Sequence, residues 1–363
     1  KIVYAIYSDA LQQNTRTAGY ETQIQALVDR GLLPGDTDID RVLFDGNIVA
    51  SFRGQFDYLQ APTGDELADQ QDQVFSNERR ILNPNGYQNP YTIQYTAGYQ
   101  RQLRDDLLFY VDLIHTRSYH LPRLRNLNAP ASWDIDASTP PDEAVRPPEV
   151  ADTTRPLADL GPAGDGVIPG GARNIVMTEM AGESKYSAAN FTLLKDRAGD
   201  RYSYRLTYTL SRLENNTDDI NFRAVDANQF DEEWGPSLND RLHVLNGLFQ
   251  VHPTPRWTLS LAALIQSGQP ANRIPDATIY GTTDLNGDGR FFGDAYLGNS
   301  DRSPGVSRNS DRLPWSHVYD LGIAYRVPAG PGELELRMDV FNVFNAENLS
   351  GYANNATQSN QIQ

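Results

Sequence analysis

Cysteine is absent from the 363 residues, so the chain has no disulfide, no zinc–thiolate site and no thiol nucleophile. Long apolar runs are also missing. The longest, such as LLFYV (107–111) and LAALI (261–265), fall far short of the ~18 residues that indicate a membrane helix. A helical membrane protein is therefore excluded, and the lack of cysteine suits a compartment in which free thiols would oxidise.

Basic residues are too few for a nucleic-acid-binding protein. The 31 Lys and Arg face 47 Asp and Glu, which gives a net charge of −16 and a field that repels phosphate backbones. A signal peptide is not seen either, because KIVYAIYSDA has one Lys and no long apolar core. We therefore expect no nucleic acid as a partner, and we expect a secreted form to be a processed or partial chain.

Alternation of apolar and polar residues is the dominant pattern. In GELELRMDV (332–340) the odd and even positions separate Glu, Arg and Asp from Leu, Met and Val. Strands are predicted by the same pattern at 91–100, 202–211, 257–266 and 319–327, and by weaker alternation at 107–118, 186–195 and 241–251. The sequence thus predicts an all-β, antiparallel fold built from two-faced strands.

The links between these strands alternate strictly between short and long. Short links rich in Gly, Pro and Asp fall at 101–107, 195–201, 252–255 and 328–332, and long links fall at 119–185, 213–240 and 268–316. A soluble β-sandwich whose apolar face forms the core remains an alternative. Sorting of links by length favours a transmembrane β-barrel, with short turns on one side and long loops on the other.

In a barrel the apolar face meets lipid, the polar face lines the lumen, and Tyr and Trp near strand ends form interfacial girdles. Residues 89–345 are expected to form the antiparallel barrel hairpins. Residues 1–88 are predicted to hold one or two further strands and a long loop, with strand candidates at 1–8 and 41–54 and helical spacing at 21–32.

The most specific local motif is DLNGDGRFFGD (284–294). Asp284, Asn286 and Asp288 stand at alternate positions before Gly289, as at the start of a calcium loop, and Asp294 could add a carboxylate. An EF-hand would place Glu at its twelfth position, where this chain has Ala295. The alternatives are a structural calcium site that makes the outer loop rigid and a tight turn favoured by Asn-Gly and Asp-Gly.

Other polar and aromatic residues suggest contacts but no catalytic site. His115 and His120 match no metal-protease motif, and the sequence has no nucleophile elbow or phosphate-binding loop. The acidic stretch 231–240 could contact a ligand or a second cation, or could be a solvated loop. Aromatic side chains outside the strand cores could stack on a sugar or peptide, or simply pack in loops: Trp234, Trp315 and Tyr352.

Seven stretches in order resemble one family of outer-membrane proteins. They are NPYTIQYTAGYQRQL (89–103), HLPRLRNLN (120–128), YSAANFTLL (186–194), YTLSRLENN (208–216), GPSLNDRLHVLNG (235–247), DLNGDG with RNSDR (284–312) and DVFNVFN (339–345). Together they resemble the C-terminal barrel half of TonB-dependent receptors, closest to the Oar-like group with a carboxypeptidase-regulatory-like domain. The resemblance implies a barrel of about 22 strands around a plug, located in the outer membrane of a Gram-negative bacterium.

The resemblance also implies partners: outer-membrane lipid, a bulky solute, the TonB complex through a segment before residue 1, and a surface lipoprotein. The chain departs from the family at both ends. No plug or TonB box precedes residue 1, and 346–363 reads as a loop before a missing final strand. Because an incomplete set of strands would leave unpaired backbone in lipid, we expect this chain to be part of a longer one.

Three functions remain open from the sequence. The first is import of a bulky nutrient, of the peptide or oligosaccharide class, through a TonB-dependent barrel. The second is a structural or secretion-associated barrel that binds surface partners without transport. The third, a barrel enzyme, lacks any nucleophile and base motif, so we expect no enzymatic activity.

Overall fold

A computed structural model of the protein describes residues 18–43, 78–160, 173–218, 222–289 and 301–349. Its strands are β1 (Glu78–Ile81), β2 (Tyr91–Arg104), β3 (Leu107–Asn126), β4 (Asn174–Lys195), β5 (Tyr202–Asn215), β6 (Gly235–Pro236), β7 (His243–Val251), β8 (Trp257–Gln266), β9 (Pro270–Ala271), β10 (Asp311–Arg312), β11 (Ser316–Ala329) and β12 (Gly332–Val340). Its helices are α2 (Ala18–Asp29), α3 (Ile39–Leu43), α5 (Pro148–Thr153) and α6 (Ala277–Tyr280), with 3-10 turns η2 (Ala158–Leu160) and η3 (Phe230–Glu233).

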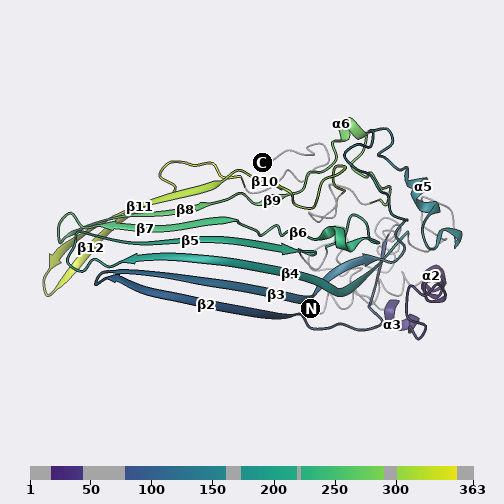
Figure 1. The fold of residues 1–363 in the computed structure, drawn as a ribbon, viewed down its shortest axis with the longest axis horizontal. Helices are drawn as coiled ribbons and strands as arrows, with labels where there is room; N and C mark the ends of the chain where they lie inside the picture. The colour runs from purple at the N-terminus through teal and green to yellow at the C-terminus, as the bar shows by residue number, and fades with distance from the viewer. Residues whose placement is uncertain (1–17, 44–77, 161–172, 219–221, 290–300, 350–363) are drawn as a thin grey trace, which may run out of the picture.

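Eight long strands form one antiparallel sheet in the order β12-β11-β8-β7-β5-β4-β3-β2. Consecutive long strands are neighbours throughout, as expected for an up-and-down barrel wall, and the predicted antiparallel fold is confirmed. Figure 1 shows the hairpin turns gathered at one end of this sheet and the helices and irregular loops at the other. None of the helices in the described residues is long and apolar enough to span a membrane.

Strand register places the alternating side chains in continuous rows. One row across five neighbouring strands joins Tyr204, Phe249, Leu261, Leu321 and Val340. The adjacent row on the opposite face joins Ser203, Gln250, Ser260, Gly322 and Asp339. Because the pattern repeats from strand to strand, the sheet has one apolar face and one polar face.

Aromatic contacts occur near both ends of the apolar face. At the turn end Trp257 lies 4.5 Å from Tyr325, measured between ring centroids. At the loop end Tyr91 stacks on Tyr119 at 5.1 Å, and the His243 and Trp315 rings stack at 5.6 Å. Amphipathic rings at two levels with aliphatic side chains between them are the arrangement expected of interfacial girdles.

Two strands run further toward the loop end than the alternation predicts. β3 continues to Asn126 through register shifts between Ser118 and Arg123, and β4 already begins at Asn174. The long connection between them is therefore 127–173, where the sequence predicts 119–185. The other long connections, 216–242 and 267–315, lie close to the expected ranges.

The residues before 88 differ from the expected barrel strands. The predicted strand 41–54 begins inside helix α3, and the rest of it lies outside the described residues, as does 1–8. Helix α2 overlaps the helical spacing at 21–32, and β1 pairs in parallel with the first residues of β4. These elements share an apolar core with the loop end of the sheet: Ile24, Leu27, Leu33, Val42, Ile81, Leu127, Leu157 and Ile175.

Candidate functional site

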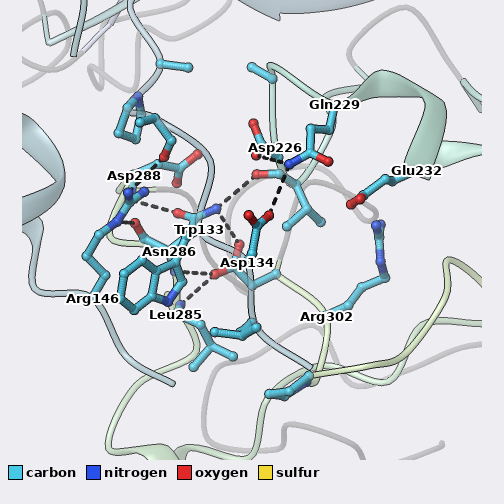
Figure 2. A pocket seen from close by; sticks show the side chains of 18 of the residues that line it. Trp133, Asp134, Arg146, Asp226, Gln229, Glu232, Leu285, Asn286, Asp288 and Arg302 are labelled. Atoms are coloured by element: carbon cyan, nitrogen blue, oxygen red, sulfur yellow. Dashed lines mark hydrogen bonds between the residues drawn. The ribbon is translucent and has the colours of Figure 1, made fainter. Parts of the chain in front are cut away.

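The three long connections meet at the loop end of the sheet and enclose a cavity of about 310 Å³, which we call the loop pocket. Figure 2 shows its labelled side chains facing one another across the opening. Connection 127–173 contributes Trp133, Asp134 and Arg146; connection 216–242 contributes Asp226, Gln229 and Glu232; connection 267–315 contributes Leu285, Asn286, Asp288, Asp301 and Arg302. Segments far apart in sequence thus build one pocket.

Arg146 joins two of the connections. Its backbone N–H donates to the Leu285 carbonyl (2.8 Å), and its guanidinium donates to the carbonyls of Asn286 (2.6 Å) and Ala131 (2.8 Å). The guanidinium carbon also lies 5.2 Å from the centroid of the Trp133 ring. Burial lowers the pKa of Arg146 against the attraction of nearby carboxylates, first Asp288. These hydrogen bonds from Arg146 hold the backbone of connection 127–173 against that of connection 267–315.

Two further arginines fix the connection 216–242. Both terminal nitrogens of Arg302 donate hydrogen bonds to the Glu233 carboxylate, at 2.8 and 3.1 Å. The fully buried Arg308 donates to the carbonyls of Asn215 (2.6 Å) and Glu233 (2.9 Å) and forms an ion pair with Asp218. Bidentate and multiply hydrogen-bonded guanidinium groups fix geometry as well as adding attraction, so the three connections form one cross-linked unit.

The predicted calcium motif is folded as a tight acidic turn on the wall of the loop pocket. Asp284 accepts the backbone N–H groups of Gly287 (2.8 Å) and Gly289 (3.0 Å), and Asn286 Oδ1 accepts that of Asp288 (2.8 Å). Gly287 and Gly289 have positive φ, of 70° and 85°. Glycine adopts this conformation without a steric penalty, which explains the two Gly residues in the motif.

Asp301, from outside the motif, accepts hydrogen bonds from the backbone of this turn. It is buried, and one of its oxygens accepts the backbone N–H groups of Leu285 (2.5 Å) and Asn286 (3.0 Å). Burial, followed by the negative charges of Asp288 and Asp284, raises the pKa of Asp301 well above its ordinary value. Spacing within the motif gives no sign of this residue, because it comes from the far side of the same connection.

The oxygen atoms of the turn already have protein partners. Besides the backbone bonds to Asp284 and Asn286, Arg173 donates to the Gly287 carbonyl (3.0 Å) and Arg155 to the Asp288 carbonyl (3.2 Å). Asp294 lies outside the described residues. Within the described ranges, no three His, Cys, Asp or Glu side chains are grouped so that they could hold a metal ion. Calcium binding stays a prediction.

The other residues selected from the sequence separate into wall and loop positions. His115 shares a hydrogen bond with Ser187 (3.0 Å) on the sheet, and His120 packs edge-on against Tyr91. Trp315 belongs to the aromatic contacts at the loop end of the apolar face.

The acidic stretch 231–240 contributes only in part to the loop pocket. Glu232 lines it, Glu233 is buried against Arg302, and Asp231 and Trp234 are exposed outside it. Tyr352 lies outside the described residues. Trp133 is the aromatic residue that lines the loop pocket, although it stands in a Pro- and Asp-rich stretch with no periodicity.

Comparison with known families agrees with the two-faced sheet. A model described as an outer membrane beta barrel domain matches residues 4–363. The chain belongs to this family. As a member of the outer-membrane β-barrel family it resides in the outer membrane of a Gram-negative bacterium, so the apolar face of its sheet contacts lipid. A search of curated protein sequences finds no match.

Solved structures similar to this barrel chain include three outer-membrane proteins. The outer membrane transporter YddB from Escherichia coli is 10% identical, with a TM-score of 0.46, over 77% of this chain and 32% of YddB. A mutant of the ferric enterobactin receptor PfeA from Pseudomonas aeruginosa is 14% identical (TM-score 0.41; 73% and 27%). The siderophore receptor PiuA from Acinetobacter baumannii is 12% identical (TM-score 0.39; 75% and 26%). The chain therefore spans about a third or less of their lengths.

Proposed function

We propose that this chain is the barrel portion of a TonB-dependent receptor that imports a bulky nutrient of the peptide or oligosaccharide class. The observation that carries the proposal is the convergence of all three long connections on one pocket at the loop end of a lipid-facing sheet. A purely structural wall would need no such enclosure. The seven stretches that resemble TonB-dependent receptors support the same function.

In this proposal the solute first meets the loop pocket from outside the cell. The arginine contacts that join the connections keep the lining residues in place before the solute arrives. Ordering the site in advance reduces the entropy lost on binding. Force supplied through TonB would then drive the solute inward.

Uptake in living cells tests the proposal. A strain that lacks the gene is complemented with the full-length protein and grown on a peptide mixture or on oligosaccharides as the limiting nutrient. We expect complementation to restore growth on one of the two nutrients when TonB is present and not when it is deleted. Growth that does not depend on TonB, with altered display or secretion of surface proteins, would instead indicate the structural or secretion-associated barrel.

A further inference from the structure

Acidic side chains dominate the loop pocket. Five carboxylates line it, from Asp134, Asp226, Glu232, Asp288 and Asp301, against two guanidinium groups. The two guanidinium groups are already engaged: Arg146 by backbone carbonyls and the Trp133 ring, and Arg302 by Glu233, which lies outside the pocket. Even without Asp301, whose buried carboxyl has a raised pKa, four carboxylates line the pocket against these two guanidinium groups, so the unmatched charge of the lining is negative.

Three of these carboxylates lie where a solute could reach them. Glu232 is exposed, and its side chain has no hydrogen bond or ion pair with any residue that the structure describes. Asp134 is exposed and accepts one long bond from Gln229 Nε2 (3.3 Å). Asp226 accepts three hydrogen bonds, from Gln229 Nε2 (3.3 Å) and from the backbone N–H (2.8 Å) and the side-chain amide (3.0 Å) of Asn228. Ionised carboxylates accept about four hydrogen bonds, so all three have acceptor capacity left.

The size of the loop pocket limits what it can hold. About 310 Å³ is at the low end of the range for small-molecule sites, roughly 300–1,000 Å³. It therefore suits one side chain or terminus of a larger solute better than the whole solute. A bare metal ion fits poorly, because in the described part of the chain no three acidic or His groups converge closely enough to coordinate one.

From this combination we infer that the loop pocket binds a cationic organic group of the solute, the ammonium or guanidinium of a basic peptide. The inference rests on the proposed import function and narrows its substrate class. Opposite charge supplies attraction over a distance, and the carboxylates at the opening accept the N–H donors. The same field repels anionic solutes.

Titration calorimetry on the full-length protein in detergent tests the inference. The probe is trilysine, compared with triglutamate and maltotriose. The pocket variant combines Asp226→Asn with Glu232→Gln, which removes two charges and keeps an oxygen acceptor at each position. Its matched control combines Asp142→Asn with Asp231→Asn, two exposed acids outside the pocket lining, so both variants change the net charge equally.

We expect trilysine to bind the parent protein, the pocket variant to bind it at least tenfold more weakly, and the control to remain within twofold. Triglutamate should give no binding heat. Heat-modifiable migration on gels checks that each variant is folded. If the double variant misfolds, the single variant Glu232→Gln, at an exposed position, replaces it and is expected to weaken trilysine binding about threefold. Absence of trilysine binding, equal weakening in the control, or tighter binding of maltotriose would overturn the inference.

Failure here is distinct from failure of the import function. Binding in detergent requires no TonB, so a protein that restores TonB-dependent growth but does not bind trilysine contradicts only the cationic substrate class. A protein that binds trilysine without restoring any TonB-dependent growth contradicts import and leaves the chemistry of the pocket intact.

Discussion

At the scale of single residues, buried carboxylates and arginines fix the geometry of the loop end. Asp152 Oδ1 accepts Arg155 Nε at 2.5 Å and Arg173 Nε at 2.7 Å, and all three side chains are buried. Both arginines also donate to the acidic turn at 287–288. This cluster therefore connects helix α5 with the wall of the loop pocket.

Replacement of Asp152 by Asn should loosen that connection. It leaves two buried guanidinium groups without their counter-charge, a change that typically costs about 3–5 kcal/mol. We expect faster hydrogen exchange in residues 127–160 and 173–176, with little change in the strands at the turn end. Equal exchange in parent and variant would show that the ion pairs contribute no local stability.

Acid should have a related effect in the parent protein. Burial raises the pKa of Asp152, but hydrogen bonds from Arg155 and Arg173 outweigh burial and hold the pKa below the ordinary value of an aspartate. The pKa of Asp152 is therefore lower in the folded than in the unfolded protein. Its ionised carboxylate stabilises the fold above the unfolded-state pKa, and this stabilisation is lost as the pH falls through the folded-state pKa. Protection of 127–160 should decline below about pH 4 in the parent and much less in Asp152→Asn.

The calcium prediction belongs to the same scale. If the turn at 284–289 binds calcium, limited proteolysis within 267–315 should be slower with calcium than with a chelator, and Asp288→Asn should abolish the difference. Asp276→Asn, at the N-cap of α6 in the same connection, serves as a control because its carboxylate accepts from Thr278 and not from the turn. Identical cleavage in all conditions would eliminate the site.

Residue spacing predicts only the local part of this region. Asp284, Asn286 and Asp288 can be found from the sequence because a turn of this kind is defined by neighbours along the chain. Arg146, Arg155 and Asp301 cannot, since their partners depend on how separate connections fold against one another. Charge alone does not distinguish a buried arginine from a solvated one.

At the scale of the strands, the decisive property is that rows of opposite polarity alternate along the whole sheet. Leu261 lies in an apolar row between Phe249 and Leu321, while Gln250 lies in the next row on the polar face. Leu261→Arg should destabilise the membrane-inserted protein by about 2–4 kcal/mol, because it places a charge in hydrocarbon. Gln250→Arg should cost much less. Urea unfolding in lipid vesicles measures both, and equal costs would contradict lipid contact at Leu261.

Alternation predicted the strands within the membrane better than their continuation beyond it. Beyond the aromatic rings at the loop end, connections and helices cover β3 and β4 on both faces. Odd- and even-numbered residues are therefore buried alike, as Leu124, Ile175 and Val176 show. Period-two patterning disappears when both sides of a strand are covered. Before residue 88 the helical spacing at 21–32 overlaps α2, but α3 lies where a strand was predicted from 41, because the apolar partners of this segment come from β1 and β4 and from connection 127–173.

At the scale of the whole molecule, turns and long connections lie at opposite ends of the sheet (Figure 1). Because these 363 residues contain no cysteine, one introduced thiol is the only thiol among them, and labelling of the parent protein gives the background. In intact cells an impermeant maleimide should label Ile279→Cys, which is exposed on α6, and should label Asp105→Cys, at the β2–β3 turn, only after permeabilisation. The reverse pattern would require the opposite orientation in the membrane.

Helices α2 and α3 and strand β1 share their apolar core with the loop end, beyond the level of the aromatic rings. This small assembly is stabilised mainly by contacts outside the bilayer. If the loop end faces the outside of the cell, as the proposed function requires, sequence changes in this assembly alter the exposed surface while the hydrogen-bonded wall in the lipid stays the same. In that orientation the outward-facing end can change in sequence without disturbing the strands that hold the chain in the membrane.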